Sequence, residues 1–83
     1  MATLEERIAE RVIKEVARIF KKDVSELTRD TRFVEDLQVK SLNVVELVAV
    51  LEDAFEVEVP FAEARRRSTI GEAIDLVISL RRR

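Results

Sequence analysis

The residues most able to do chemistry gather around Ser41. This serine opens a strongly apolar segment, and acidic residues follow on or just past that segment at Glu46, Glu52, Asp53 and Glu56. A nucleophilic serine needs a base, most often a histidine, and the sequence contains no histidine. Lys40 is the sequence neighbour of Ser41 and is badly placed to activate the same hydroxyl. We therefore predict no catalytic residue, and the chemistry left to Ser41 is to accept a group from another enzyme.

The predicted position of Ser41, at the start of a helix, suits an attached phosphate. Unpaired N–H groups and the helix dipole favour an anion there by about 0.3–1 kcal/mol at an exposed site. Lys40 adds a favourable charge beside it. The alternative is that Ser41 is only an N-cap, and Asn43 with Glu46 offers a competing cap two residues later. Local sequence alone favours the N-cap interpretation.

Composition limits the chain to one small domain. Its 83 residues fit a single core, so we assign residues 1–83 to one domain. One glycine and one proline are too few for a turn-rich β fold. No apolar run reaches the ~18 residues of a membrane span, and no leader sequence opens the chain. With neither cysteine nor histidine we predict no disulfide and no metal site. We expect a cytoplasmic monomer.

Helical periodicity dominates the first quarter of the sequence. Thr3 with Glu6 forms a capping box, and we predict a first helix over residues 4–21. Residues 22–40 show no clean periodicity. We expect them to form a long ordered loop with a short helical turn near Ser25–Leu27, pinned by the apolar residues Val24, Leu27, Phe33, Val34 and Leu37.

Three further helices complete the prediction. The second spans Ser41–Phe55, and its inward-facing residues are expected to be Leu42, Val45, Val48 or Ala49, Leu51 and Phe55. Val44, Leu47 and Val50 widen its apolar surface. A short third helix spans Phe61–Arg66, with Pro60 near its start. Thr69 with Glu72 opens the last helix, which continues to Leu80. The expected fold is all-α, a small four-helix bundle.

A series of short motifs then carries a family resemblance. It consists of F-V-E-D-L at Phe33–Leu37, S-L at Ser41–Leu42, V-E-L at Val45–Leu47, L-E-D-A-F at Leu51–Phe55, V-P at Val59–Pro60 and T-I-G-E-A-I-D at Thr69–Asp75. In this order and spacing the chain resembles the acyl carrier protein family. The resemblance implies that a phosphopantetheinyl transferase moves 4′-phosphopantetheine from coenzyme A to Ser41. The thiol of that arm would then hold acyl intermediates as thioesters for partner enzymes of a fatty acid or specialised lipid or polyketide pathway.

The resemblance also implies a face that contacts partner enzymes. We assign to it Lys40, Leu42, Glu46, Leu47, Glu52 and Asp53. Exposed charges of this kind speed and orient docking more than they tighten it, and salt weakens them. The alternative for the acids is an ordinary solvated helix face. The resemblance further suggests that the core between the second and last helices admits an acyl chain.

The sequence departs from the family pattern near the serine. Lys40 replaces the family's aspartate, Asn43 replaces a frequent acid, and Gln38 stands where glycine is common. Arg65–Arg67 lie where many members are acidic. These departures indicate a specialised carrier that serves a dedicated pathway.

Other functions stay open at this point. An amino-acyl or peptidyl carrier would look the same, and a helical interaction module could keep the fold without the arm. The arginines at 65–67 and 81–83 raise nucleic-acid or membrane-surface binding as a further possibility. The acidic middle of the chain and the absence of tyrosine and tryptophan disfavour it, so we expect no nucleic-acid partner.

Overall fold

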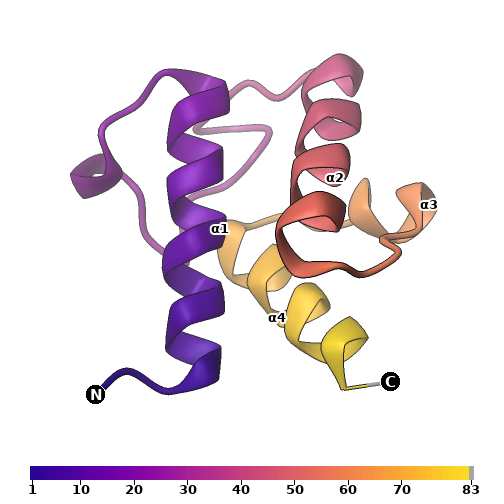
Figure 1. The fold of residues 1–83 in the computed structure, drawn as a ribbon. Coiled ribbons are helices and arrows are strands. Elements are labelled where there is room, and N and C mark those ends of the chain that lie inside the picture. The colour runs from indigo at the N-terminus through magenta and orange to yellow at the C-terminus, as the bar shows by residue number, and fades with distance from the viewer. Residues whose placement is uncertain (83) are drawn as a thin grey trace.

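Four helices and one short turn make up the fold. The computed structural model describes residues 1–82. Its elements, in chain order, are α1 (Leu4–Phe20), a 3-10 turn η1 (Val24–Glu26), α2 (Ser41–Phe55), α3 (Phe61–Ala64) and α4 (Ile70–Arg81) (Figure 1). The described residues contain no strand beyond one isolated bridge between Arg32 and Thr69. The predicted all-α four-helix bundle is confirmed.

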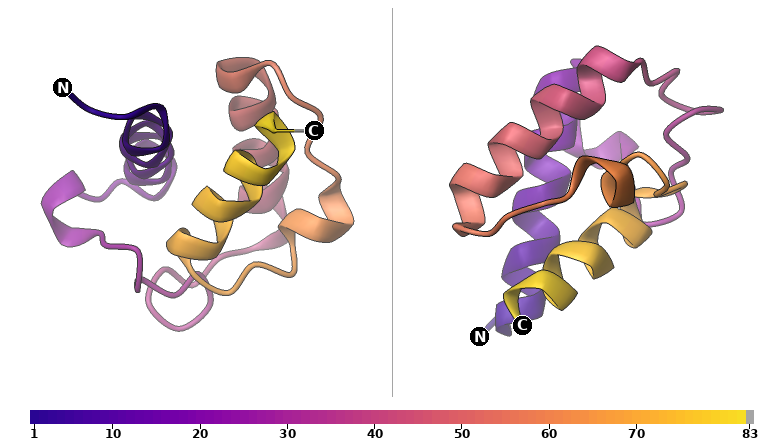
Figure 2. Two further views of the ribbon diagram at one scale, coloured as in Figure 1. Left: turned by 90° about the horizontal axis from the view of Figure 1, so that it is seen from below. Right: turned by 90° about the vertical axis from the view of Figure 1, so that its right-hand side faces the viewer.

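The packing places α1 against both α4 and α2, and α3 against α2. Seen from below, α3 lies on the side of α2 and α4 that is turned away from α1 (Figure 2). The largest fully buried side chains come from α1 and α4: Val12, Val16, Ile70, Ile74 and Val77. The core therefore lies chiefly between these two helices, and α2 covers it.

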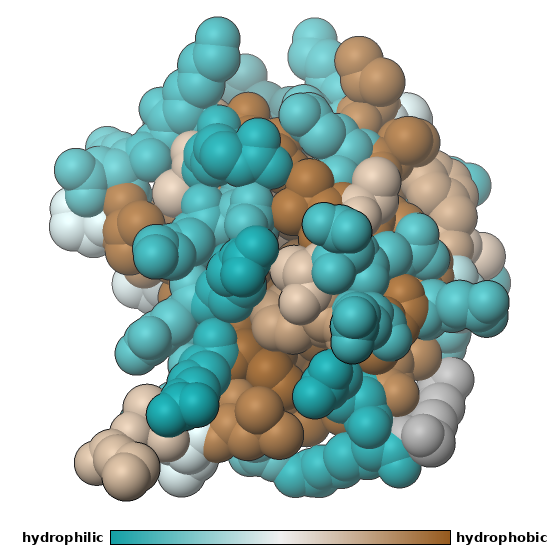
Figure 3. Space-filling model, in the orientation of Figure 1, coloured by the Kyte–Doolittle hydropathy of each residue, from teal (hydrophilic) through white to brown (hydrophobic). Residues whose placement is uncertain are grey.

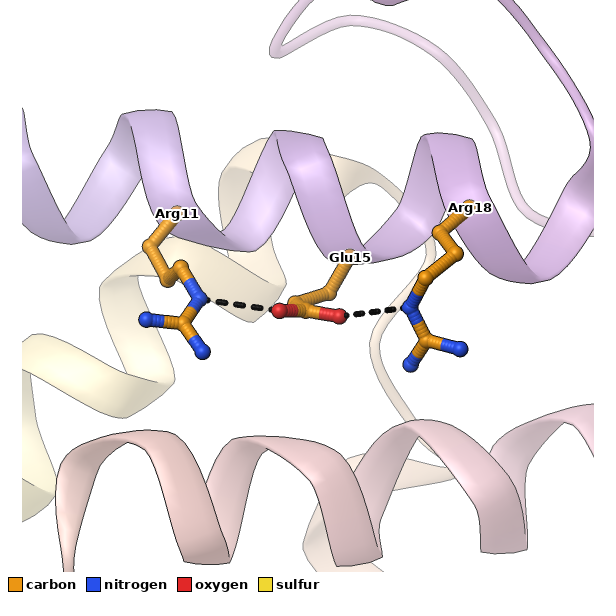
Figure 4. Close-up of polar contacts among 3 residues, drawn as sticks. All are labelled: Arg11, Glu15 and Arg18. Atoms are coloured by element: carbon orange, nitrogen blue, oxygen red, sulfur yellow. Dashed lines mark hydrogen bonds and ion pairs between the residues drawn. The ribbon is translucent and has the colours of Figure 1, made fainter.

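The first helix follows its sequence signals. Thr3 Oγ1 accepts from Glu6 N–H at 3.1 Å and Glu6 Oε1 accepts from Thr3 N–H at 3.0 Å, so the predicted capping box is present. The helix ends one residue earlier than predicted because Lys21 adopts a left-handed conformation with φ 56°. Glu15 accepts from Arg11 Nε at 2.8 Å and from Arg18 Nε at 3.0 Å along one side of this helix (Figure 4).

The long loop before α2 is held by backbone hydrogen bonds to the start of α4. Phe33 N–H donates to the Ser68 carbonyl at 2.9 Å, and Ile70 N–H donates to the Thr31 carbonyl at 3.0 Å. Gly71 N–H donates to the Arg29 carbonyl at 2.9 Å, and a side chain at position 71 would meet that oxygen at 3.0 Å. The expected ordered loop is thus confirmed.

Apolar pinning of this loop is only partly as predicted. Leu27, Phe33 and Leu37 are buried in the core, whereas Val24 and Val34 are 48% and 65% exposed. The expectation for Val24 and Val34 was wrong, because the loop has no regular period that fixes which side chains turn inward. The helical turn lies at Val24–Glu26, one residue before the predicted position.

Helix α2 has the predicted bounds, and its inner face is partly as predicted, since Leu51 is buried and Phe55 packs against the core. Leu47 and Leu51 are buried, whereas Leu42 and Val45 are 74% and 51% exposed. The prediction that Leu42 and Val45 face inward was therefore wrong. The helix carries apolar residues on nearly all sides, so several stripes fit the helical period equally well.

Helix α3 is shorter than predicted, and the capping bonds of α4 differ from the predicted capping box. Helix α3 ends at Ala64 rather than Arg66. Thr69 caps α4 by accepting from Glu72 N–H at 3.2 Å, while Glu72 Oε1 accepts from Ser68 N–H at 2.8 Å instead of from Thr69. The second bond of the predicted capping box therefore goes to the N–H of Ser68 instead of Thr69. Helix α4 ends at Arg81, one residue after the predicted Leu80.

Candidate functional site

Ser41 is the first residue of α2, and its side chain is exposed. The N-cap is Lys40, with φ −114° and ψ 162°, so the N-cap interpretation of Ser41 was wrong. Asn43 is not the N-cap either: it lies at the third helical position, from which its Oδ1 accepts from the N-cap Lys40 N–H at 2.9 Å, as in a capping box. Within residues 1–82 the Ser41 hydroxyl makes no hydrogen bond, which leaves its oxygen accessible for modification.

The local backbone suits an anion on that oxygen. The first ladder bond of α2 runs from Val44 N–H to the Lys40 carbonyl at 3.2 Å, so the N–H groups of residues 41–43 precede the intrahelical ladder. These groups, the helix dipole and the Lys40 ammonium all favour negative charge. A phosphodiester on Ser41 fits this environment.

A tight turn directs the chain into Ser41. Gln38 has φ 53°, a left-handed conformation that glycine adopts without strain. Its N–H donates to the Val34 carbonyl at 3.1 Å, and Val39 N–H donates to the Phe33 carbonyl at 2.9 Å. The glycine common at this position of the family pattern thus has a conformational reason, and this chain meets the same geometry with glutamine.

An Arg32–Asp36 clamp stabilises the same turn. Asp36 Oδ2 accepts from Arg32 N–H at 2.8 Å, and Asp36 Oδ1 accepts from the Arg32 guanidinium at 3.2 Å. The backbone bond first, and the guanidinium second, lower the pKa of the Asp36 carboxyl below its usual value. Asp36 is therefore a fixed acceptor in the loop five residues before Ser41.

The face around Ser41 mixes exposed apolar and charged side chains. Hydrophobic side chains gather at the upper end of α2 (Figure 3), where Leu42 and Val45 are largely exposed. Lys40, Glu46 and Asp53 are exposed as well. These positions are available to a partner surface.

Two residues predicted for that face have other roles. Leu47 is 9% exposed and belongs to the core, so its assignment as a partner contact does not fit its burial. The Glu52 carboxylate accepts from Val59 N–H at 2.9 Å and ties the end of α2 to the following segment. The family resemblance placed both residues on the partner face, and the helical period could not correct this for Leu47 because several apolar stripes of α2 fit the core equally well.

A small cavity lies between the loop, α2 and α4. Its volume is about 70 Å³, and most of its lining is apolar, from Phe33, Val34, Val39, Val44, Leu47, Val48, Leu51, Val59, Ala64, Ala73, Leu76 and Val77. Arg65 and Arg67 complete the wall. The sequence reasoning missed the part taken by these arginines, because they follow α3 and nothing in their spacing indicates an interior role.

The C-terminal arginines make contacts within the fold. Arg81 donates to the Phe55 carbonyl at 2.8 Å and so caps the end of α2. Arg82 pairs with Glu5 and joins the end of α4 to the start of α1. Arg83 lies outside the described residues. Over residues 1–82, no group of acidic side chains is placed to hold a metal ion, and no helix is long and apolar enough to cross a membrane.

Comparison with known proteins identifies the family. The family described as "Phosphopantetheine attachment site" matches residues 10–77, and the chain belongs to it. Among solved structures, the acyl carrier protein from Enterococcus faecalis superposes with a TM-score of 0.78 at 28% sequence identity. The match covers 94% of this chain and 99% of that one. The protein is thus a carrier whose family uses a 4′-phosphopantetheine prosthetic group, and catalysis lies with the enzymes that act on such carriers.

Proposed function

We propose that this protein is an acyl carrier protein with its 4′-phosphopantetheine arm on the Ser41 hydroxyl. A phosphopantetheinyl transferase supplies the arm from coenzyme A, and the arm's thiol carries acyl intermediates as thioesters. Tethering makes each later reaction effectively intramolecular, so the carrier raises local concentration without a catalytic group of its own.

One observation carries this proposal. Ser41 is the first residue of α2 and presents an exposed hydroxyl at the helix N-terminus. It follows a turn that is held by the left-handed Gln38 and by the hydrogen bond from Arg32 N–H to Asp36. The other serines lie elsewhere in the fold. Ser25 is in the 3-10 turn η1, Ser79 is in α4, and the Ser68 carbonyl accepts the hydrogen bond from Phe33 N–H. Ser41 therefore combines exposure with a backbone that favours an attached phosphate.

Mass spectrometry tests the attachment site. Incubation with coenzyme A and a broad-specificity transferase is expected to add one phosphopantetheine to the wild-type protein and none to Ser41→Ala, because the acceptor oxygen is lost. Ser79→Ala, at an exposed position of α4, is the matched control and is expected to react like wild type. Addition to Ser41→Ala would place the arm elsewhere. No addition to wild type with several transferases would favour the unmodified interaction module.

We further propose that partners dock on the face formed by Lys40, Leu42, Glu46 and Asp53. These four side chains are exposed on either side of Ser41 or along α2. Lys40 makes the charge at the attachment point less negative than the family pattern, which favours a dedicated pathway over the general fatty acid synthase enzymes. The intact mass of protein isolated from its host distinguishes fatty acyl, polyketide and amino-acyl cargo. A single carrier domain over residues 1–83, a monomeric state and a cytoplasmic location stay predictions.

A further inference from the structure

Two exposed cations, Lys40 and Arg65, have no ion-pair partner within residues 1–82. The acids closest to them in the sequence do not offset their charge by direct contact. Asp36 pairs instead with Arg32 at 3.2 Å, and Glu63 forms no ion pair in the same part of the chain. Lys40 and Arg65 therefore present their positive charge to whatever approaches this surface.

Two backbone hydrogen bonds bring the segments that carry these cations together. Phe33 N–H donates to the Ser68 carbonyl at 2.9 Å, which joins the chain just after α3 to the long loop. The Phe33 carbonyl accepts from Val39 N–H at 2.9 Å, directly before Lys40. Arg65 lines the same small cavity as Val39, and α3 packs against α2. Lys40 and Arg65 therefore both lie at the start of α2, on the side of α3.

Acidic side chains follow further along α2. Glu46 and Asp53 are exposed, and neither forms an ion pair within residues 1–82. The docking face thus has a positive end at Lys40 and Arg65 and a negative end beyond it. An anionic membrane or a nucleic acid carries one sign of charge, so it would attract the first end and repel the second. A protein surface can match both ends.

We propose that the enzymes that act on Ser41 or its arm dock with carboxylates opposite Lys40 and Arg65. Basic groups of these enzymes then face only Glu46 and Asp53. A partner surface that is basic throughout would be repelled by the positive end of the face. This inference rests on the proposed carrier function and names the charge pattern of the partner.

Charge reversal on the carrier and on an enzyme tests this pattern. The probe is a broad-specificity phosphopantetheinyl transferase with lysine or arginine at its active-site entrance, compared with a form in which glutamate replaces those residues. Mass spectrometry at low salt gives kcat/KM for addition of the arm. Arg65→Glu is expected to raise kcat/KM with the basic form roughly threefold and to lower it with the glutamate form by a similar factor. Lys40→Glu combined with Arg65→Glu is expected to change both values roughly tenfold.

Arg7→Glu is the matched control, since it makes the same change in net charge. Arg7 is exposed in the first turn of α1, at the other end of the molecule from the start of α2 (Figure 1). Its kcat/KM is expected to stay near the wild-type value with both enzyme forms. A damaged fold or a less reactive Ser41 hydroxyl would lower both rates, whereas the expected changes have opposite signs. About 0.5 M salt is expected to remove the difference by screening.

Three outcomes separate the possibilities. Equal kcat/KM for Arg65→Glu and Arg7→Glu with every active enzyme form would overturn the proposal. So would binding to phosphatidylglycerol vesicles or to DNA at about 0.15 M salt by wild type but not by Arg65→Glu, because the cation would then serve a lipid or a nucleic acid. Failure of both enzyme forms to modify any of these variants would count against the carrier function itself. If the glutamate form lacks activity, the expected rise with the basic form still separates Arg65→Glu from Arg7→Glu.

Discussion

At the scale of single residues, the site depends on three neighbours with separate tasks. Ser41 offers an exposed oxygen, and Lys40 places a positive charge at the N-terminus of α2. Gln38, in a left-handed conformation, turns the backbone into this helix. Gln38 is the strained member, because a left-handed conformation brings the Cβ of an L-residue close to its own backbone. The departure from glycine at this position therefore has a structural cost that can be measured.

Gln38→Gly is expected to stabilise the fold by about 0.5–1 kcal/mol. Relief of the left-handed strain exceeds the extra entropy that glycine loses on folding. Urea unfolding followed by circular dichroism measures the change. Gln38→Ala is the matched control and is expected to bring no gain, since alanine keeps the Cβ. Destabilisation by glycine would mean that the Gln38 side chain makes a stabilising contact that outweighs the strain.

At the scale of elements, α2 performs two tasks with one sequence. Its buried side covers the core through Leu47 and Leu51, while Leu42 and Val45 remain on the exposed face beside Ser41. The Glu52 carboxylate fixes the opposite end of the helix to Val59. An acid that looks like part of a partner face thus has a role in the fold, unlike its exposed neighbour Asp53.

Glu52→Ala is expected to lower the free energy of unfolding by about 1–2 kcal/mol. The substitution removes the acceptor of the Val59 N–H group, which is partly buried and then lacks a partner. Asp53→Ala, on the exposed side of the same turn, is expected to change stability by less than about 0.5 kcal/mol. Chemical denaturation of both variants makes the comparison. If both variants changed the free energy of unfolding by less than about 0.5 kcal/mol, Glu52 would have no role in stability and would be left with partner docking alone.

At the scale of the whole molecule, fixed carboxylates link the fold to pH. The pKa of Glu6 is lowered first by the Thr3 N–H group, and the pKa of Glu15 first by the Arg11 side chain. The pKa of Asp23 is lowered first by the Ser25 N–H group, and that of Asp36 first by the Arg32 N–H group. These four acids stabilise α1, η1 and the loop before Ser41.

Stability is therefore expected to fall in acid. Each carboxyl has a lower pKa in the folded state than its unfolded value of about 3.9 for Asp or 4.3 for Glu. Its contribution is complete above the unfolded pKa and is lost as pH falls through the folded pKa. Thermal unfolding should give a constant Tm from about pH 6 to 5 and a declining Tm below about pH 4. Asp36→Asn is expected to reduce the decline, and a Tm that rises in acid would contradict the assignment.

The sequence by itself determined the helices, their order and the position of Ser41. Capping residues such as Thr3 and Thr69 and the helical spacing of α1 and α4 are local signals, and local signals act over a few residues of one chain segment. Only the tertiary structure decided which side of α2 is buried, that Val34 is exposed and that Leu47 belongs to the core. It also decided that Arg67 borders the cavity. These outcomes depend on contacts between segments that are far apart in the sequence. Where apolar residues lie on nearly all sides of a helix, its sequence does not encode which side packs against the neighbouring helices.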